Sequence, residues 1–334
     1  MKTFLRNITL LAVFICSSVA AQDVQFSQFY SNPLYLGPSF AGAIEGSRIA
    51  TTYRKQWWDL ALPFNAYSVS YDHYFSTFNS GIGVFFMKDV AGSSELGSTT
   101  VSLNYSYNFQ VFNVWYIRPG ISFSYLEHGL NGRLLLFSSL GSEEANTDDT
   151  NYLNSLGQGL ETTRDIDAGT SMLVYTERFW IGATYDHLLE PNVSLYAGNT
   201  QIPKKFQAYG GFEFHRRGKL LKPSDETMTI AFLYKNQATA QQLDLGMYWY
   251  GGGGNTPFIL GLWYRGIPLV NSQFGDAMVF LAGIKTRSFN IGYSYDFTIS
   301  SLLPYTKGSH EISMAYKFLL PKKYKRGAVP CPEF

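Results

Sequence analysis

The chain is short of charge, of cysteine and of long apolar runs. Asp, Glu, Lys and Arg supply 15% of its 334 residues, whereas an ordinary soluble domain contains about 25%. After the first 21 residues, no stretch approaches the 18 or so consecutive apolar residues that a membrane-spanning helix requires. The formal net charge of +1 offers no electrostatic basis for binding nucleic acid. These shortages argue against a helical membrane protein and against a nucleic-acid-binding protein.

The amino terminus has the pattern of a secretory signal peptide. Two basic residues precede an apolar run over residues 8–16, and small residues then lead to a polar segment. We therefore expect residues 1–21 to be a signal peptide that is cleaved between Ala21 and Gln22. Cys331 is then the one cysteine of the mature chain, which excludes an intrachain disulfide and a cysteine metal cluster.

Aromatic residues are abundant, and they alternate with small polar ones. The chain contains 26 Phe and 24 Tyr. Over residues 99–109, every second side chain is apolar or aromatic, with few exceptions, and residues 289–297 and 312–318 repeat the pattern. Such alternation is typical of β-strands with one apolar face, and a transmembrane strand has about 9 to 11 residues. The pattern therefore predicts strands long enough to cross a membrane.

Fourteen segments alternate in this way, and the connections between them alternate in length. Short connections, such as 75–79 and 286–287, fall at every second junction, whereas residues 128–164 form a long one. Outer-membrane barrels have an even number of strands, short periplasmic turns and longer outer loops. The sequence thus predicts an all-β fold, a transmembrane antiparallel β-barrel of about 14 strands over residues 48–320, in the outer membrane with both termini periplasmic. The predicted strands are 48–57, 64–74, 80–88, 96–109, 114–127, 165–175, 178–187, 205–215, 227–236, 241–250, 257–267, 276–285, 288–297 and 309–320.

A soluble β-sandwich is the alternative for any single strand, because its strands also alternate, with the apolar face turned inward. Aromatic residues gather near the ends of the predicted strands, as at Trp57, Trp115 and Trp249. Rings at these positions match the aromatic girdles that flank the apolar band of a membrane barrel. This clustering favours the barrel.

Two terminal segments lie outside the predicted barrel. Residues 22–47 contain Pro33 and Pro38 among several aromatic residues, and proline interrupts a strand ladder. We expect this amino-terminal segment to be periplasmic or to plug the lumen, and favour its folding into the periplasmic mouth and partly filling the lumen. Residues 321–334 include four basic residues and are expected to form a short basic tail in the periplasm.

Motifs for catalysis are missing from the mature sequence. Its five histidines are far apart, and no nucleophile elbow, zinc-protease pair or phosphate-binding loop occurs. We expect neither enzymatic activity nor a cofactor or metal. Charged residues at lumen positions are expected to form ion pairs, because buried charges need partners, with a selectivity ring as the alternative. These residues are Asp72, Asp186, Asp296, Arg54, Arg265, Asp244, Glu213 and Lys317.

The longest connection carries an acidic patch, made of Glu143, Glu144, Asp148 and Asp149. Carboxylate oxygens suit a divalent cation, but the spacing differs from that of an EF-hand loop. We therefore interpret the patch as part of a solvated outer loop and as a candidate contact for a partner protein.

Several short motifs resemble those of PorP/SprF-type membrane proteins of the type IX secretion system. They begin at the expected mature amino terminus and end with Cys331-Pro332-Glu333-Phe334. Between these ends, the matching segments are 22–30, 32–36, 38–42, 53–57, 291–296 and 308–313, whose most telling residues are Gln25, Phe26, Ser27, Gln28, Asn32, Pro33, Arg54, Trp57, Tyr295 and Asp296.

The resemblance implies a non-enzymatic outer-membrane barrel that supports export or surface retention of a large secreted protein, such as a gliding adhesin. It also implies that the partners are this secreted protein and other type IX secretion components, with outer-membrane lipid around the barrel. The alternatives are a porin or a plugged channel for hydrophobic solutes. An outer-membrane lipase is a third possibility, but it would need a Ser, His and Asp or Asn at one strand height, which no predicted arrangement offers.

Overall fold

The computed structural model describes residues 23–60, 63–91, 96–112, 114–129, 162–194, 199–217, 225–251, 257–266, 276–300 and 306–319. These residues form fifteen strands and two short 3₁₀ helices, η1 (Pro33–Tyr35) and η2 (Pro38–Phe40). The strands are β1 (Gly46–Gln56), β2 (Phe64–Phe75), β3 (Ser80–Ala91), β4 (Leu96–Tyr107), β5 (Phe109–Phe112), β6 (Trp115–Gly129), β7 (Thr163–Tyr175), β8 (Phe179–Asp186), β9 (Lys205–Arg217), β10 (Asp225–Gln237), β11 (Ala240–Gly251), β12 (Phe258–Gly266), β13 (Ala277–Lys285), β14 (Phe289–Thr298) and β15 (Ser309–Leu319).

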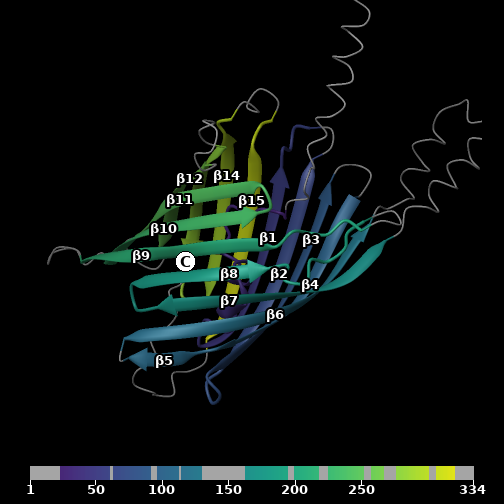
Figure 1. Cartoon of the computed structure of the whole chain (residues 1–334). Helices are drawn as coiled ribbons and strands as arrows, with labels where there is room; N and C mark the ends of the chain where they lie inside the picture. Colours follow the sequence, from purple (N-terminus) through teal and green to yellow (C-terminus); the bar gives the residue numbers. More distant parts are fainter. Residues whose placement is uncertain are drawn as a thin grey trace, which may run out of the picture.

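The strands form one closed antiparallel barrel (Figure 1). Each long strand pairs with the next one along the chain, and β15 pairs with β1 to complete the ring. The short strand β5 extends the turn between β4 and β6 and pairs with β6, with a register shift between Gln110 and Phe112. The ring therefore has 14 long strands and one extra short strand, so the predicted barrel is confirmed. One predicted strand, 96–109, is divided into β4 and β5 because Asn108 interrupts it.

The alternation in the sequence separates the outer face of the barrel from the lumen. On β2, the side chains of Tyr67, Val69 and Tyr71 point outward and are 45–47% exposed, whereas Ser68 and Ser70 point inward and are at most 1% exposed. Because successive side chains of a strand lie on opposite faces, the same pattern repeats around the ring. The outer face is apolar and aromatic, as a lipid-facing surface requires.

No helix in the part of the chain that the structure describes has the length and hydropathy to cross a membrane.

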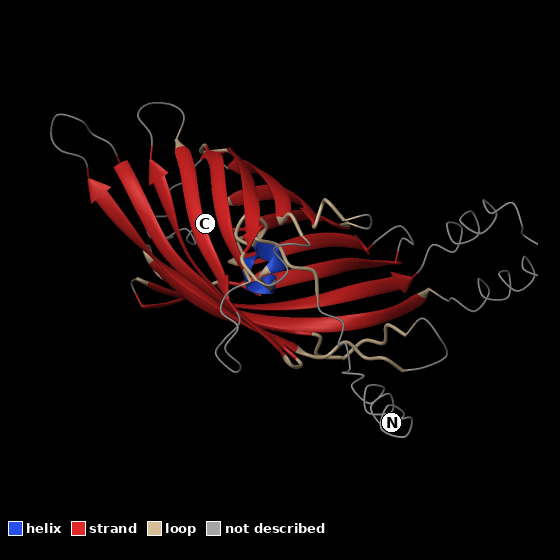
Figure 2. Ribbon diagram, turned by 90° about the horizontal axis from the view of Figure 1, so that it is seen from above, coloured by secondary structure: helices blue, strands red, loops and turns tan. Residues whose placement is uncertain are grey.

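The segment from Asp23 to Glu45 lies inside the ring of strands, and Figure 2 shows its two short helices surrounded by the barrel. Its apolar side chains pack against inward-facing rings of the wall: Phe29 contacts Trp263, and Phe40 lies 5.5 Å from Tyr209 between ring centroids. Phe26, Phe29, Leu36 and Phe40 are at most 4% exposed. The segment and the inward-facing apolar residues of the wall thus form a common core inside the barrel.

Two glycines allow this close packing. A Cβ atom on Gly81 of β3 would lie 1.9 Å from the carbonyl oxygen of Ala41, and one on Gly120 of β6 would lie 2.3 Å from the amide nitrogen of Ser39. Backbone atoms cannot move aside as a flexible side chain can. Glycine at these positions is therefore needed for the segment to lie against the wall.

The first and last described residues lie at opposite ends of the barrel. Asp23 contacts His187, Lys205 and Gln237, which adjoin the connections β8–β9 and β10–β11. Leu319 pairs with Gly46 at the other end, where the turns β7–β8 and β13–β14 are short. The segment from Asp23 to Glu45 therefore runs from the long-loop end to the short-turn end, rather than occupying one mouth alone. Gln22 and residues 321–334 lie outside the described residues.

Candidate functional site

The densest group of buried charges lies where the amino-terminal segment meets the wall of the barrel. Inward-facing positions on four strands place Arg54 (β1), Arg265 (β12), Asp296 (β14) and Glu311 (β15) in the lumen, each at most 5% exposed. Arg54 lies opposite Glu311 in the pairing of β1 with β15. The group therefore lies at the seam where the first and last strands close the barrel.

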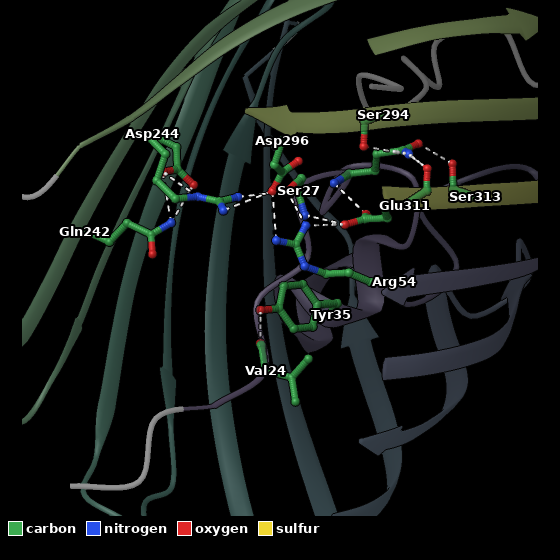
Figure 3. Close-up of polar contacts among 12 residues, drawn as sticks. Val24, Ser27, Tyr35, Arg54, Gln242, Asp244, Ser294, Asp296, Glu311 and Ser313 are labelled. Atoms are coloured by element: carbon green, nitrogen blue, oxygen red, sulfur yellow. Dashed lines mark hydrogen bonds and ion pairs between the residues drawn. The ribbon is translucent and has the colours of Figure 1, made fainter. Parts of the chain in front are cut away.

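Ser27 of the amino-terminal segment joins these charges (Figure 3). Its hydroxyl group donates to Asp296 Oδ2 at 2.6 Å and accepts from Arg54 Nη1 at 2.6 Å and from Arg265 Nη2 at 2.8 Å. Arg54 also contacts Asp296 at 2.8 Å and Glu311 at 3.0 Å. One small hydroxyl group thus connects an anion and two cations that arise from three strands.

Glu311 holds the backbone of the segment. Its two carboxylate oxygens accept hydrogen bonds from the amide groups of Ser27 and Gln28, both at 2.7 Å. The side chain of Gln28 then donates to Ser294 Oγ and to the carbonyl oxygen of Glu311, and accepts from Ser313 Oγ. A buried polar group needs such partners, and here the wall supplies all of them.

Further contacts hold the segment nearer the short-turn end. Arg48 pairs with Asp72 at 2.9 Å, and Asp72 accepts a hydrogen bond from the amide of Gly42. Arg118 donates to the carbonyl oxygens of Ala41 and Gly42. The segment is therefore anchored through its backbone as well as its side chains.

Asn32 is a third anchoring point. Its amide nitrogen donates to Ser68 Oγ, and its amide oxygen accepts from Ser70 Oγ. Both serines lie on β2, so Asn32 ties the segment to that strand.

A second charged cluster fixes the other end of the segment, at Asp23. The carboxylate of Asp23 lies 2.6 Å from Lys205 Nζ and 2.9 Å from His187 Nε2, while His187 Nδ1 lies 2.7 Å from Asp167 Oδ2. Burial alone would lower the pKa of His187, but the carboxylates of Asp23 and Asp167 raise it to about 9. Burial raises the pKa of Asp23, and Lys205 and His187 more than offset this, so that it lies well below its ordinary value. Both groups are charged at neutral pH.

A cavity of about 720 Å³ adjoins this cluster at the long-loop end. Asp23, Val24, Gln25 and Tyr35 of the segment form part of its lining, and polar residues of the strand ends form much of the rest. Its charged wall residues are Arg54, Asp89, Lys205, Lys235, Arg265 and Asp276. Two smaller cavities, of about 50 and 170 Å³, lie between the segment and other parts of the wall.

The structure brings together four of the residues that carried the resemblance: Ser27, Gln28, Arg54 and Asp296. Phe26 and Pro33 are buried within the segment, and Gln25 lines the cavity. Trp57 also lines the cavity, where its ring packs on Phe64. Tyr295 lies apart from the site, because its hydroxyl group donates to the carbonyl oxygen of Lys307 outside the lumen.

The ion pairs observed include most of the charged residues that the sequence suggested. Asp186 contacts Lys205, and Arg265 contacts both Asp244 and Asp296. Glu213 instead contacts His215, away from Ser27. The ion-pair prediction omitted several residues that form such pairs: Asp23, Arg48, Asp167, His187, Lys205 and Glu311. The sequence could have indicated Glu311, because it lies two residues from both Ser309 and Ser313 and therefore shares their inward face of β15.

The acidic patch Glu143, Glu144, Asp148 and Asp149 lies outside the described residues, as do Ala21 and Gln22.

Comparison with protein-family models gives a match over most of the chain. A family model described as "Type IX secretion system membrane protein PorP/SprF" matches residues 18–316. A search of the curated proteins gives no match.

Three of the solved structures that match this chain have low sequence identity to it. The monoaromatic hydrocarbon channel CymD has a TM-score of 0.48 and 14% identity, over 87% of this chain and 93% of that chain. The outer membrane protein Omp33 of Acinetobacter baumannii has a TM-score of 0.45 and 8% identity, over 83% and 100%. A FadL homologue of Pseudomonas aeruginosa has a TM-score of 0.45 and 10% identity, over 90% and 99%.

Proposed function

Because the chain belongs to the PorP/SprF family of type IX secretion system membrane proteins, we propose that it supports export or surface retention of a large secreted protein, such as a gliding adhesin. In this role it is a non-enzymatic barrel that works with other components of the secretion system. The closed barrel and the family's membrane assignment support a location in the outer membrane.

The observation that carries this proposal is the occupied lumen. Residues 23–45 lie inside the barrel, and buried ion pairs and hydrogen bonds tie them to the wall at Ser27, Gln28 and Asp23. Removing one partner of a buried ion pair typically destabilises a protein by about 3–5 kcal/mol. A segment held in this way acts as a plug, which suits docking of a protein better than diffusion of a solute.

The orientation of the barrel follows from its connections. Short turns of outer-membrane barrels face the periplasm, so we place the short-turn end, Leu319 and the basic tail 321–334 in the periplasm. Asp23 then lies toward the cell surface. After cleavage between Ala21 and Gln22, the mature amino terminus would lie in the outer half of the barrel, not in the periplasm with the tail. The long loops, including the acidic patch in residues 130–161, are the candidate contacts for the secreted protein.

Deletion of the gene, followed by proteomics of the cell surface and of the medium, tests the proposal. We expect one large surface protein to be lost from the surface, and expression of the wild-type gene to restore it. The porin alternative predicts normal secretion and altered solute uptake, together with ion conductance of the purified barrel in a planar bilayer. Normal surface proteins in the deletion strain would overturn the docking role.

A further inference from the structure

Lys235 is a buried ammonium group with no carboxylate within ion-pair distance. Its side chain projects from β10 into the lumen, and the residue is 7% exposed. The polar contact recorded for its Nζ atom is the hydroxyl group of Tyr35, at 3.5 Å, and the Nζ atom also lies 5.4 Å from the centre of that ring. Among the described residues, no carboxylate oxygen lies within 4.0 Å of it. The carboxylate of Asp244, which contacts Arg265, acts on Lys235 only from beyond this distance. Buried charges are normally paired directly, so this lysine lacks a direct partner.

Lys205, on the adjacent strand β9, is a buried lysine of the same lumen that does form direct ion pairs. Its Nζ atom lies 2.6 Å from Asp23 and 3.4 Å from Asp186. Arg54 and Arg265 likewise contact carboxylates within the network around Ser27. The other cations near Lys235 therefore contact carboxylates directly, whereas Lys235 contacts none.

Lys235 lines the cavity of about 720 Å³ at the long-loop end. This volume lies within the range of about 300–1,000 Å³ that is typical of ligand sites. Five glutamines contribute to the same lining: Gln25, Gln56, Gln237, Gln241 and Gln242. The amides of Gln237 and Gln242 already bond to Asp23 and Asp244, so Gln25, Gln56 and Gln241 are the ones open to a ligand. A glutamine amide can both donate and accept a hydrogen bond, which matches the peptide groups of an extended chain.

We propose that this cavity binds a carboxylate group at the end of a peptide chain, with Lys235 as its counter-ion and the glutamine amides around the adjoining peptide groups. The site lies at the long-loop end, beside Asp23 and above Tyr35, whose hydroxyl group donates to the carbonyl oxygen of Val24. The amino-terminal segment thus forms part of the floor of the site. The choice of a peptide rests on the proposed function, because a docked protein would supply one, whereas the choice of a carboxylate rests on Lys235 alone.

Isothermal titration calorimetry on the purified, full-length mature protein in detergent tests this site. The probes are N-acetyl-triglycine with a free terminal carboxylate, the same peptide with a terminal amide, and sodium acetate. We expect the free acid to bind at one site and the amide to bind about tenfold more weakly or worse, as for loss of a buried charge pair. Equal binding of acid and amide, or no binding of either, would overturn the carboxylate site.

Variants connect the binding to Lys235. Lys235→Gln is expected to weaken binding of the free acid by about tenfold or more, and Lys235→Arg, which keeps the charge, to restore it to within a few-fold of wild type. Lys88→Gln is the matched control, because Lys88 points outward from β3 and its loss should leave binding unchanged. An unchanged affinity in Lys235→Gln would refute the role of Lys235.

The titration with sodium acetate distinguishes a peptide carboxylate from a small organic acid as the ligand. If acetate binds as tightly as the peptide acid, the site takes a small organic acid and the peptide part of the proposal is wrong. Binding in vitro is independent of the secretion phenotype of the deletion strain. Failure of the calorimetric test would therefore leave the proposed function intact, and failure of the proteomic test would leave the carboxylate site intact.

Discussion

Arg54 Nη2 lies 2.8 Å from Asp296 Oδ2, although 242 residues separate the two along the chain. Their strands, β1 and β14, are not neighbours, because β15 lies between them. The contact therefore spans the seam of the barrel, and Ser27 of the amino-terminal segment bonds to both partners. The side chains of Arg54 and Asp296 therefore contribute both to closing the barrel and to holding the amino-terminal segment against its wall.

Loss of Arg54 should destabilise the barrel strongly. Arg54→Met leaves the buried carboxylates of Asp296 and Glu311 short of a cation, at an expected cost of about 3–5 kcal/mol. The measurement is the temperature at which the folded form converts to the unfolded form on a detergent gel. Arg164→Met is the control, because Arg164 pairs with Glu127 at the surface with 63% of its side chain exposed, and such pairs contribute about 0–1 kcal/mol. Equal midpoints for the two variants would contradict this assignment.

Replacing Glu311 should loosen the backbone of the segment. In Glu311→Gln, one of the two carboxylate oxygens that accept from the amides of Ser27 and Gln28 becomes an amide nitrogen, which cannot accept. An unsatisfied buried donor costs about 1–3 kcal/mol, so hydrogen exchange of these two amides should accelerate by about tenfold or more. Glu127→Gln, at a partly exposed position away from the segment, serves for comparison and should leave the exchange as it is in the wild type. Unchanged protection in Glu311→Gln would show that the carboxylate is not the anchor.

A methyl group at position 81 should displace the segment from the wall. In Gly81→Ala, the new Cβ atom would lie 1.9 Å from the carbonyl oxygen of Ala41, which is far inside a normal contact. Cleavage of residues 23–45 by an added protease should become faster, measured by mass spectrometry of the fragments. Gly266→Ala places its Cβ atom against the edge of the Tyr264 ring, which can move, so this variant should resist cleavage like the wild type.

Docking of the segment at Asp23 should weaken as the solution becomes alkaline. The pKa of His187 is raised from 6.5 to about 9 by the carboxylates that surround it. A raised pKa means that protonation favours the docked state, so its contribution is complete below pH 6.5 and disappears as the pH rises through about 9. The groups facing His187 are Asp23, Asp167 and Lys205. The pKa of Asp23 is lowered, so its own contribution is present above about pH 4 and is lost only in acid.

Electron paramagnetic resonance measures this change. A spin label on Val24→Cys, in a Cys331→Ser background, should become more mobile between pH 6.5 and pH 9.5. The same label in His187→Gln should show mobility that no longer changes over this range, because glutamine does not titrate. A mobility that is independent of pH in the protein with His187 would rule out this role for the histidine.

The sequence by itself determined the barrel. Tyr67, Val69 and Tyr71 alternate with Ser68 and Ser70, and this period of two assigns each residue of β2 to the lipid or to the lumen without reference to any other strand. The number of long strands follows from repeating that local rule along the chain. Such features depend on neighbours along the chain, which is why they are visible in the sequence.

Only the tertiary structure decided which lumen residues meet and where the amino-terminal segment lies. Asp296 has Arg54 and Ser27 as partners because β1 and β15 close the ring, and no local pattern encodes that closure. The same holds for Asp23, whose contacts with His187 and Lys205 require the segment to run through the lumen to the long-loop end. The free energy of a buried charge depends on distances across the lumen, and these distances exist only after the barrel has closed around the segment.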